Sequence, residues 1–122
     1  MAIYFSRVRE ILDGAVAQWE ARTGRPAQLF LHAPSFGWRT RTELLQATAR
    51  GLRLISPEDI SKKSGATSNL VVALTSGVAG FPRMPRGGPF LDQSKIQEII
   101  DWINEGALDD PPSPEDVAAT SN

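Results

Sequence analysis

The stretch Phe81-Pro82-Arg83-Met84-Pro85-Arg86-Gly87-Gly88-Pro89-Phe90-Leu91, with the amphipathic run Gln93 to Ala107 behind it, decides the predicted fold. The loop holds a single methionine between prolines and a glycine pair, and proline restricts both its own backbone and the residue before it. The run behind the loop has apolar residues at helical spacing: Ile96, Ile99, Ile100 and Ile103. Such a loop either holds the Met84 thioether in a fixed direction, as a ligand position requires, or forms a rigid lid over a small core.

A second long helix is predicted near the start of the chain, from Phe5 to about Arg22. Its apolar residues recur in steps of three and four: Phe5, Val8, Leu12, Ala15, Val16 and Trp19. Gly24 provides a C-cap and Pro26 cannot continue the helix. Gly14 lies mid-helix, where glycine costs ~1 kcal/mol relative to alanine. Either another helix approaches closely there, with Trp102 as the candidate partner, or the glycine is simply tolerated.

Shorter helices are predicted between these two from their start signals. The first begins at a capping-box pattern, Thr40 with Glu43 three residues later, and runs to about Arg50, where Gly51 closes it. It is expected to bury Leu44, Leu45 and Thr48 or Ala49.

The next helix begins after Ser56, with Pro57 in its first position, and Gly65 stops it within a few residues. The last short helix runs from Asn69 to about Ser76, after a cap at Thr67 or Ser68, and turns three residues inward: Leu70, Val71 and Leu74. Asp92 is a good N-cap for the final helix.

The predicted fold class is therefore all-α, with about five short helices and with the N- and C-terminal helices packed across each other. Residues 1–107 are predicted to form one helical domain. Residues 108–122 read as an acidic, proline-rich, flexible tail, because their composition is polar and rich in proline.

Composition excludes several classes of function. The chain of 122 residues has no cysteine and one histidine, His32, so disulfides, thiolate metal sites and multi-histidine sites are excluded. Its net charge of −1 gives no general attraction to nucleic acid, and no segment has the length and hydrophobicity needed for membrane insertion. The start, Met1 to Arg7, has no apolar segment typical of a signal peptide. We expect a cytoplasmic protein, or a periplasmic one if a leader has been removed upstream.

The C-terminal part resembles a class I cytochrome c domain. The residues that carry the resemblance are Phe81-Pro82-Arg83-Met84-Pro85-x-Gly87-Gly88-Pro89, then Leu91, then Ile96-x-x-Ile99-Ile100-x-Trp102-Ile103-x-x-Gly106-Ala107. In that family the Met-Pro loop supplies the distal axial ligand of haem iron, and the first and last helices cross at a glycine–aromatic contact. The resemblance implies these roles for Met84 and for Gly14 with Trp102. Element order extends it to roughly Ile3 to Ala107.

One departure from the family pattern limits what the domain can do. Cytochromes c carry a Cys-x-x-Cys-His segment, whose cysteines bond to haem and whose histidine is the proximal ligand. The matching segment here is Gln28-Leu29-Phe30-Leu31-His32, in which Gln28 and Leu31 replace both cysteines. Covalent haem attachment is impossible, whereas non-covalent ligation of iron by His32 and Met84 remains chemically possible.

Three functions follow from these residues. The first is a haem-free accessory module that binds another protein, with side chains filling the space of haem: Leu29, Phe30, Leu31, Phe36, Trp38 and Phe81. The alternative is an electron carrier with non-covalent haem and a redox protein as its partner. In that case His32 and Met84 bind the iron, and Trp38 and Arg39 contact the cofactor. A haem propionate would pair with Arg39, Arg41, Arg50 or Arg53. The third, an enzyme, has only His32 beside Ser35 in its favour and no recognisable catalytic motif, so no enzymatic activity is expected.

Overall fold

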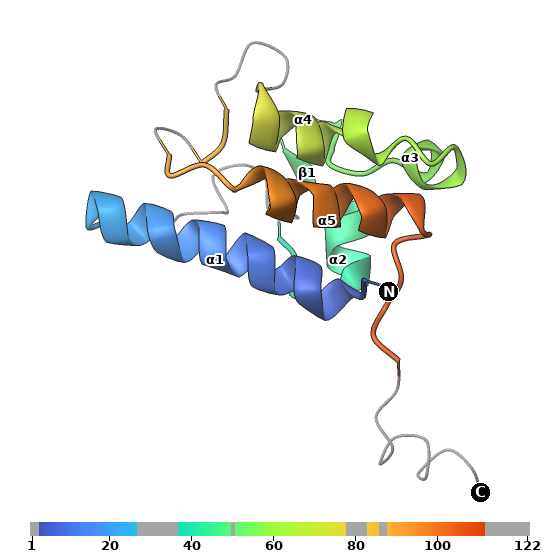
Figure 1. The fold of residues 1–122 in the computed structure, drawn as a ribbon, viewed down its shortest axis with the longest axis horizontal. Coiled ribbons are helices and arrows are strands. Elements are labelled where there is room, and N and C mark those ends of the chain that lie inside the picture. Colours follow the sequence, from blue (N-terminus) through green and yellow to red (C-terminus); the bar gives the residue numbers. More distant parts are fainter. Residues whose placement is uncertain (1–2, 27–36, 50, 78–82, 86–87, 112–122) are drawn as a thin grey trace, which may run out of the picture.

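Five α-helices carry the fold of the part of the chain that the computed structural model describes, residues 3–26, 37–49, 51–77, 83–85 and 88–111 (Figure 1). In chain order the elements are α1 (Phe5–Thr23), α2 (Arg41–Gln46), β1 (Thr48–Ala49), β2 (Leu52–Arg53), α3 (Pro57–Ser61), the 3-10 helix η2 (Gly65–Thr67), α4 (Asn69–Thr75) and α5 (Gln93–Asn104). The domain is mostly helical, as predicted. The predicted contact between the first and last helices is confirmed.

Helix α5 is the centre of the arrangement. Figure 1 shows it between α1 on one side and the layer of α3 and α4 on the other, and it also contacts η2. Ile96, Ile99 and Ile103 are fully buried, as their spacing predicts, and Ile100 is half-buried at the edge of the core. A helix that meets neighbours on opposite sides needs a wide apolar face, which the four isoleucines and Trp102 supply.

Trp102 is the largest fully buried side chain of the described residues. Its ring lies 6.3 Å from the ring of Phe5 on α1, and its indole N–H donates to the carbonyl oxygen of Leu108 at 2.9 Å. The buried indole therefore has both an apolar contact and a satisfied donor, the two conditions that a buried tryptophan requires.

The predicted contact between Gly14 and Trp102 is wrong. Gly14 is exposed, and a Cβ added to it would meet nothing within 4 Å. The glycine that lies against α5 is Gly65 of η2, where an added Cβ would lie 2.9 Å from the carbonyl oxygen of Ile100. The Gly65 N–H donates to the side chain of Asn104 at 2.8 Å. The glycine that permits a close backbone approach to α5 is thus in η2 and not in α1, although α1 also contacts α5.

The helix after Thr40 is shorter than predicted. Thr40 does cap it, because its hydroxyl oxygen accepts the Glu43 N–H at 3.0 Å. The carboxylate of Glu43, however, accepts the N–H of Arg39 instead of that of Thr40, so the capping box is only half formed. The helix ends at Gln46, and the chain continues into an antiparallel pair of two-residue strands, β1 and β2. Gly51, with φ of 81°, lies in the turn between those strands and does not close a helix.

Most other predicted helix ends are confirmed. Gly24 caps α1 in the left-handed region with φ of 70°. Ser56 forms a complete capping box with Asp59, and Ser68 caps α4, which buries Leu70, Val71 and Leu74. Asp92 occupies the N-cap position of α5, but its side chain makes no capping hydrogen bond.

The last helix ends at Asn104 and not at Ala107. The N–H of Ala107 donates to the carbonyl oxygen of Trp102 at 2.8 Å, and that of Gly106 donates to Ile103 at 3.1 Å. This pair of bonds is a Schellman motif, which satisfies carbonyls that the last turn of a helix leaves unpaired. Gly106 has φ of 106°, in the region that glycine adopts without a steric penalty.

An ion pair joins the outer faces of α1 and α5. Arg7 Nε lies 2.9 Å from Glu98 Oε1, and its Nη2 lies 3.0 Å from Oε2. Hydrogen bonding to the guanidinium lowers the pKa of Glu98 below its ordinary value, although desolvation works in the other direction. The pair is half-exposed, so we assign it at most about 1 kcal/mol of stabilisation. It orients the two helices more than it holds them together.

Candidate functional site

The Met84 loop is attached to the last turn of α4. The N–H of Met84 donates to the carbonyl oxygen of Ala73 at 2.7 Å, and Arg83 Nε donates to that of Leu74 at 2.8 Å. Carbonyl oxygens in the last turn of a helix have no partner within the helix. Ala73 and Leu74 therefore offer acceptors, and the loop uses both of them.

Helix α1 holds the same loop from its other end. Arg22, in the last turn of α1, donates from Nε to the carbonyl oxygen of Gly88 at 2.6 Å. The prediction that the loop is fixed thus has a specific cause in the described residues, namely hydrogen bonds to α4 at Met84 and to α1 at Gly88. The Met84 side chain is half-buried.

An exposed aromatic side chain lies beside the loop. The guanidinium carbon of Arg83 lies 4.4 Å from the centre of the Phe90 ring, within the range of a cation–π contact. Phe90 keeps 43% of its surface exposed, the largest fraction among the exposed large apolar residues of the described chain. Pro89 beside it is also exposed. We call Arg83, Pro89 and Phe90 the loop patch.

Trp38 and Arg39 are engaged with residues of their own chain. The indole N–H of Trp38 donates to Asp13 Oδ1 on α1 at 2.8 Å, and its half-buried ring packs against the core. The exposed side chain of Arg39 lies 3.7 Å from Glu43 at the start of α2. His32 lies outside the described residues, as does Gln28. The same is true of five of the predicted core-filling residues: Leu29, Phe30, Leu31, Phe36 and Phe81.

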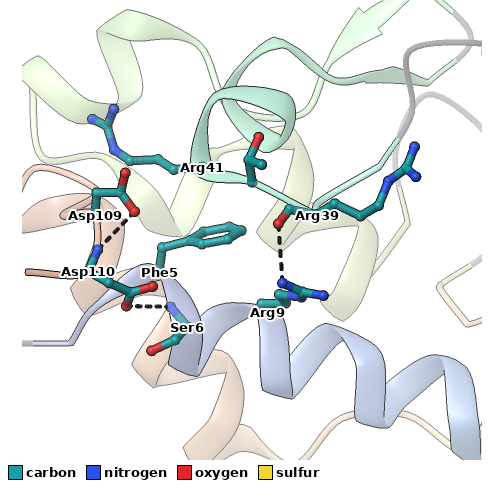
Figure 2. Close-up of a pocket in the computed structure, with 8 residues that line it drawn as sticks. Phe5, Ser6, Arg9, Arg39, Arg41, Asp109 and Asp110 are labelled. Atoms are coloured by element: carbon teal, nitrogen blue, oxygen red, sulfur yellow. Dashed lines mark hydrogen bonds between the residues drawn. The ribbon is translucent and has the colours of Figure 1, made fainter. Parts of the chain in front are cut away.

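A surface cleft that the sequence does not reveal lies where the starts of α1 and α2 meet the segment after α5. It has a volume of about 270 Å³, with the Phe5 ring directed into it and Asp109 and Asp110 on one side (Figure 2). The guanidinium groups of Arg39 and Arg41 point away from its middle in Figure 2. These arginines do not converge on one point, so the cleft is not arranged to hold an anion.

Neither a metal cluster nor a membrane-spanning helix is found in the described ranges. No group of three or more histidine, cysteine, aspartate or glutamate side chains comes together there as a metal site would require. None of the helices described is both long enough and apolar enough to cross a membrane.

The boundary predicted after Ala107 stays a prediction. Leu108 and Asp110, which follow it, hydrogen-bond to the first turn of α1. Residues 112–122 lie outside the described residues.

Comparison with known proteins gives no relative for this chain: no family model, no curated protein and no solved structure matches it.

Proposed function

We propose that the protein is a cytochrome c-like helical domain that works without haem, as an accessory module that binds another protein. The observation that carries the proposal is that, among the described residues, the protein's own side chains form an apolar core and satisfy its buried polar atoms. Apolar residues of α1, α2, α4 and α5 form one buried cluster. No buried side-chain nitrogen or oxygen of the described residues lacks a hydrogen-bond partner. Because unpaired buried polar groups are costly, this core supports a domain that is stable by itself.

The resemblance to cytochrome c supports the cytochrome-like part of this proposal. Helix α5 contacts α1, as the resemblance leads one to expect, although not through a contact between Gly14 and Trp102. The loop that bears Met84 is held by hydrogen bonds to α4 and α1. The replacement of both cysteines by Gln28 and Leu31 supports the loss of the cofactor. Inheritance of the loop with loss of its haem attachment explains both features together.

The loop patch is the surface that suits a partner best. Aromatic residues and arginine are the residue types that contribute most often to binding energy at protein interfaces. Phe90 is exposed, its ring is oriented by Arg83, and Arg22 lies close by at Gly88. The positive charge beside an exposed ring favours a protein partner with an acidic surface.

A photo-crosslinking phenylalanine analogue at position 90, introduced into the protein in its native cells, tests this assignment. We expect one specific protein adduct, because the ring would lie in the interface. The matched control places the same analogue at Leu52, which is 37% exposed on the strand β2. Adducts from both positions, or from neither, would contradict the assignment of the loop patch.

A second candidate function is that of a non-covalent haem electron carrier. It is favoured by one observation, the anchoring of Met84 through its own N–H to Ala73. A backbone held at Met84 is suited to presenting a thioether for axial ligation, and paired histidine and methionine ligands raise the potential of the iron. Met84→Leu distinguishes the two candidates, since leucine keeps the volume of methionine without the sulfur.

A further inference from the structure

Helix α1 begins without a cap of its own. The N-cap position is Tyr4, whose side chain makes no capping hydrogen bond, and the first turn contains no acidic residue. The first turn of a helix leaves backbone N–H groups without partners inside the helix. A helix of 19 residues with no local cap must satisfy these groups elsewhere.

The segment after α5 supplies the missing acceptors. The N–H of Phe5 donates to the carbonyl oxygen of Leu108 at 2.9 Å, and the N–H of Ser6 donates to Asp110 Oδ1 at 3.0 Å. Figure 2 shows the Asp110 carboxylate directed at Ser6. A carboxylate at this place is also favoured by the positive end of the α1 dipole. Asp110 thus acts as the N-cap that α1 lacks.

The same segment binds two more helices. The Leu108 carbonyl oxygen also accepts the indole N–H of Trp102 from α5 at 2.9 Å. The carbonyl oxygen of Ala107 accepts a hydrogen bond from Arg41 Nε at the start of α2. Residues 107–110 therefore connect α1, α2 and α5 at one point, at the edge of the cleft in Figure 2.

The outer part of this segment is held mainly by hydrogen bonds, because it buries little apolar surface. Ala107 is buried, but Leu108, Asp109 and Asp110 are exposed. Segments with exposed hydrogen bonds and few apolar contacts open at a smaller free-energy cost than the core. We propose that residues 108–110 form a releasable clasp, which caps α1 and joins it to α5, and which opens as a unit while the helices and the buried Ala107 stay in place.

Hydrogen exchange of the full chain, followed by NMR with increasing urea, tests the clasp. In the wild type the amides of Phe5 and Ser6 and the indole of Trp102 are expected to be protected. They should nevertheless exchange faster than the amides of Ile99 and Ile103, and with little dependence on urea, because little surface is exposed when the clasp opens.

Variants at two adjacent aspartates separate capping from charge. Asp110→Ala removes the cap and should speed exchange at Ser6 about fivefold, the effect of losing a typical N-cap. Asp110→Asn should restore much of the protection, since asparagine caps as well as aspartate does. Asp109→Ala is the matched control, because it removes the same charge while, among the described residues, the Asp109 carboxylate accepts only the N–H of Asp110. It should change exchange at Ser6 less than about twofold.

Three outcomes would overturn the proposal. Exchange of Phe5 and Ser6 at the rate of the α5 core amides, with the same urea dependence, would mean that the segment opens only when the domain unfolds. Unprotected exchange of Ser6 in the wild type would mean that no clasp forms. Equal effects of the alanine variants at 109 and 110 would mean that general charge, and not a cap, acts on α1.

Discussion

Replacing Trp102 by alanine is expected to lower the free energy of unfolding by about 3–5 kcal/mol, the range for removing a large aromatic side chain from a core. Trp102 has no exposed surface, packs against Phe5, and donates its indole N–H to Leu108. The substitution would remove a contact between α1 and α5 together with a bond to the clasp. Urea unfolding followed by far-UV circular dichroism measures the loss. Against a total stability of about 5–15 kcal/mol, such a loss can unfold much of the protein at 37 °C.

The variant Trp102→Phe separates the two contributions. Phenylalanine keeps an aromatic ring in the core but has no N–H to donate. The Leu108 oxygen would still accept the N–H of Phe5, so no buried acceptor is left without a partner. We expect a cost clearly below that of Trp102→Ala, with faster exchange at the clasp. A cost below about 1 kcal/mol for the alanine variant would contradict the placement of Trp102 at the centre of the core.

Replacing Gly65 by alanine is expected to destabilise the domain by about 1–3 kcal/mol, although alanine is usually the better helix former. The added Cβ would lie 2.9 Å from the backbone oxygen of Ile100 and 3.0 Å from the Cβ of Ile103. Neither atom belongs to a flexible side-chain end, so η2 would have to move away from α5. That movement would also strain the bond from the Gly65 N–H to Asn104. Chemical denaturation of the variant measures the effect.

Gly14→Ala is the matched control and is expected to have the opposite sign. Gly14 is exposed in the interior of α1, with nothing within 4 Å of an added Cβ. Alanine there should stabilise the protein by up to ~1 kcal/mol through helix propensity and the unfolded chain. A neutral Gly65→Ala together with a destabilising Gly14→Ala would mean that the close glycine contact with α5 is made by Gly14 and not by Gly65, one of the two alternatives that the sequence leaves open for Gly14.

The features that sequence reasoning predicts well depend on neighbours within a few residues. Ser56 caps α3 because Asp59 is three residues away, and Gly24 ends α1 because it can adopt a left-handed conformation. The buried faces of α4 and α5 follow from spacing alone, as Leu70, Leu74, Ile96 and Ile103 illustrate. Such signals need no knowledge of the rest of the fold.

The predictions that were wrong depend on contacts made outside the predicted element. Helix α2 stops early where the chain pairs Thr48 with Arg53. That hairpin is itself held by α4, because the N–H of Leu70 donates to Leu54 and the side chain of Asn69 donates to Arg53. Local helix and strand propensities cannot predict these hydrogen bonds between separate elements.

The identity of the glycine that packs against α5, Gly65 and not Gly14, and the existence of the clasp also depend on the three-dimensional arrangement of distant segments. Which glycine meets α5 depends on how each helix is rotated in the fold, and spacing does not give that rotation. The clasp joins the two ends of the described chain, since Ser6 and Asp110 are separated by 104 positions. Because composition is read locally, it cannot reveal this distant hydrogen bond, and it assigns Asp110 to the tail.

The candidate site stays a prediction. Met84 does lie on an anchored loop, and the anchor, Ala73 on α4, could not be identified from the loop itself. Trp38 and Arg39 were proposed as cofactor contacts, and the structure gives them Asp13 and Glu43 as neighbours. The roles of His32 and Met84 as iron ligands stay predictions of the second candidate function.

The absorption spectrum of the purified protein after addition of excess haem tests the haem-free account most directly. That account predicts the spectrum of free haem, with no Soret band of ligated iron, and the same spectrum for Met84→Leu. A Soret band of His/Met-ligated iron that is lost in both Met84→Leu and His32→Ala would contradict it and show non-covalent haem ligation by these two residues, as the second candidate function requires. A ligated band that survives both substitutions would also contradict it, by placing haem on other residues of the chain.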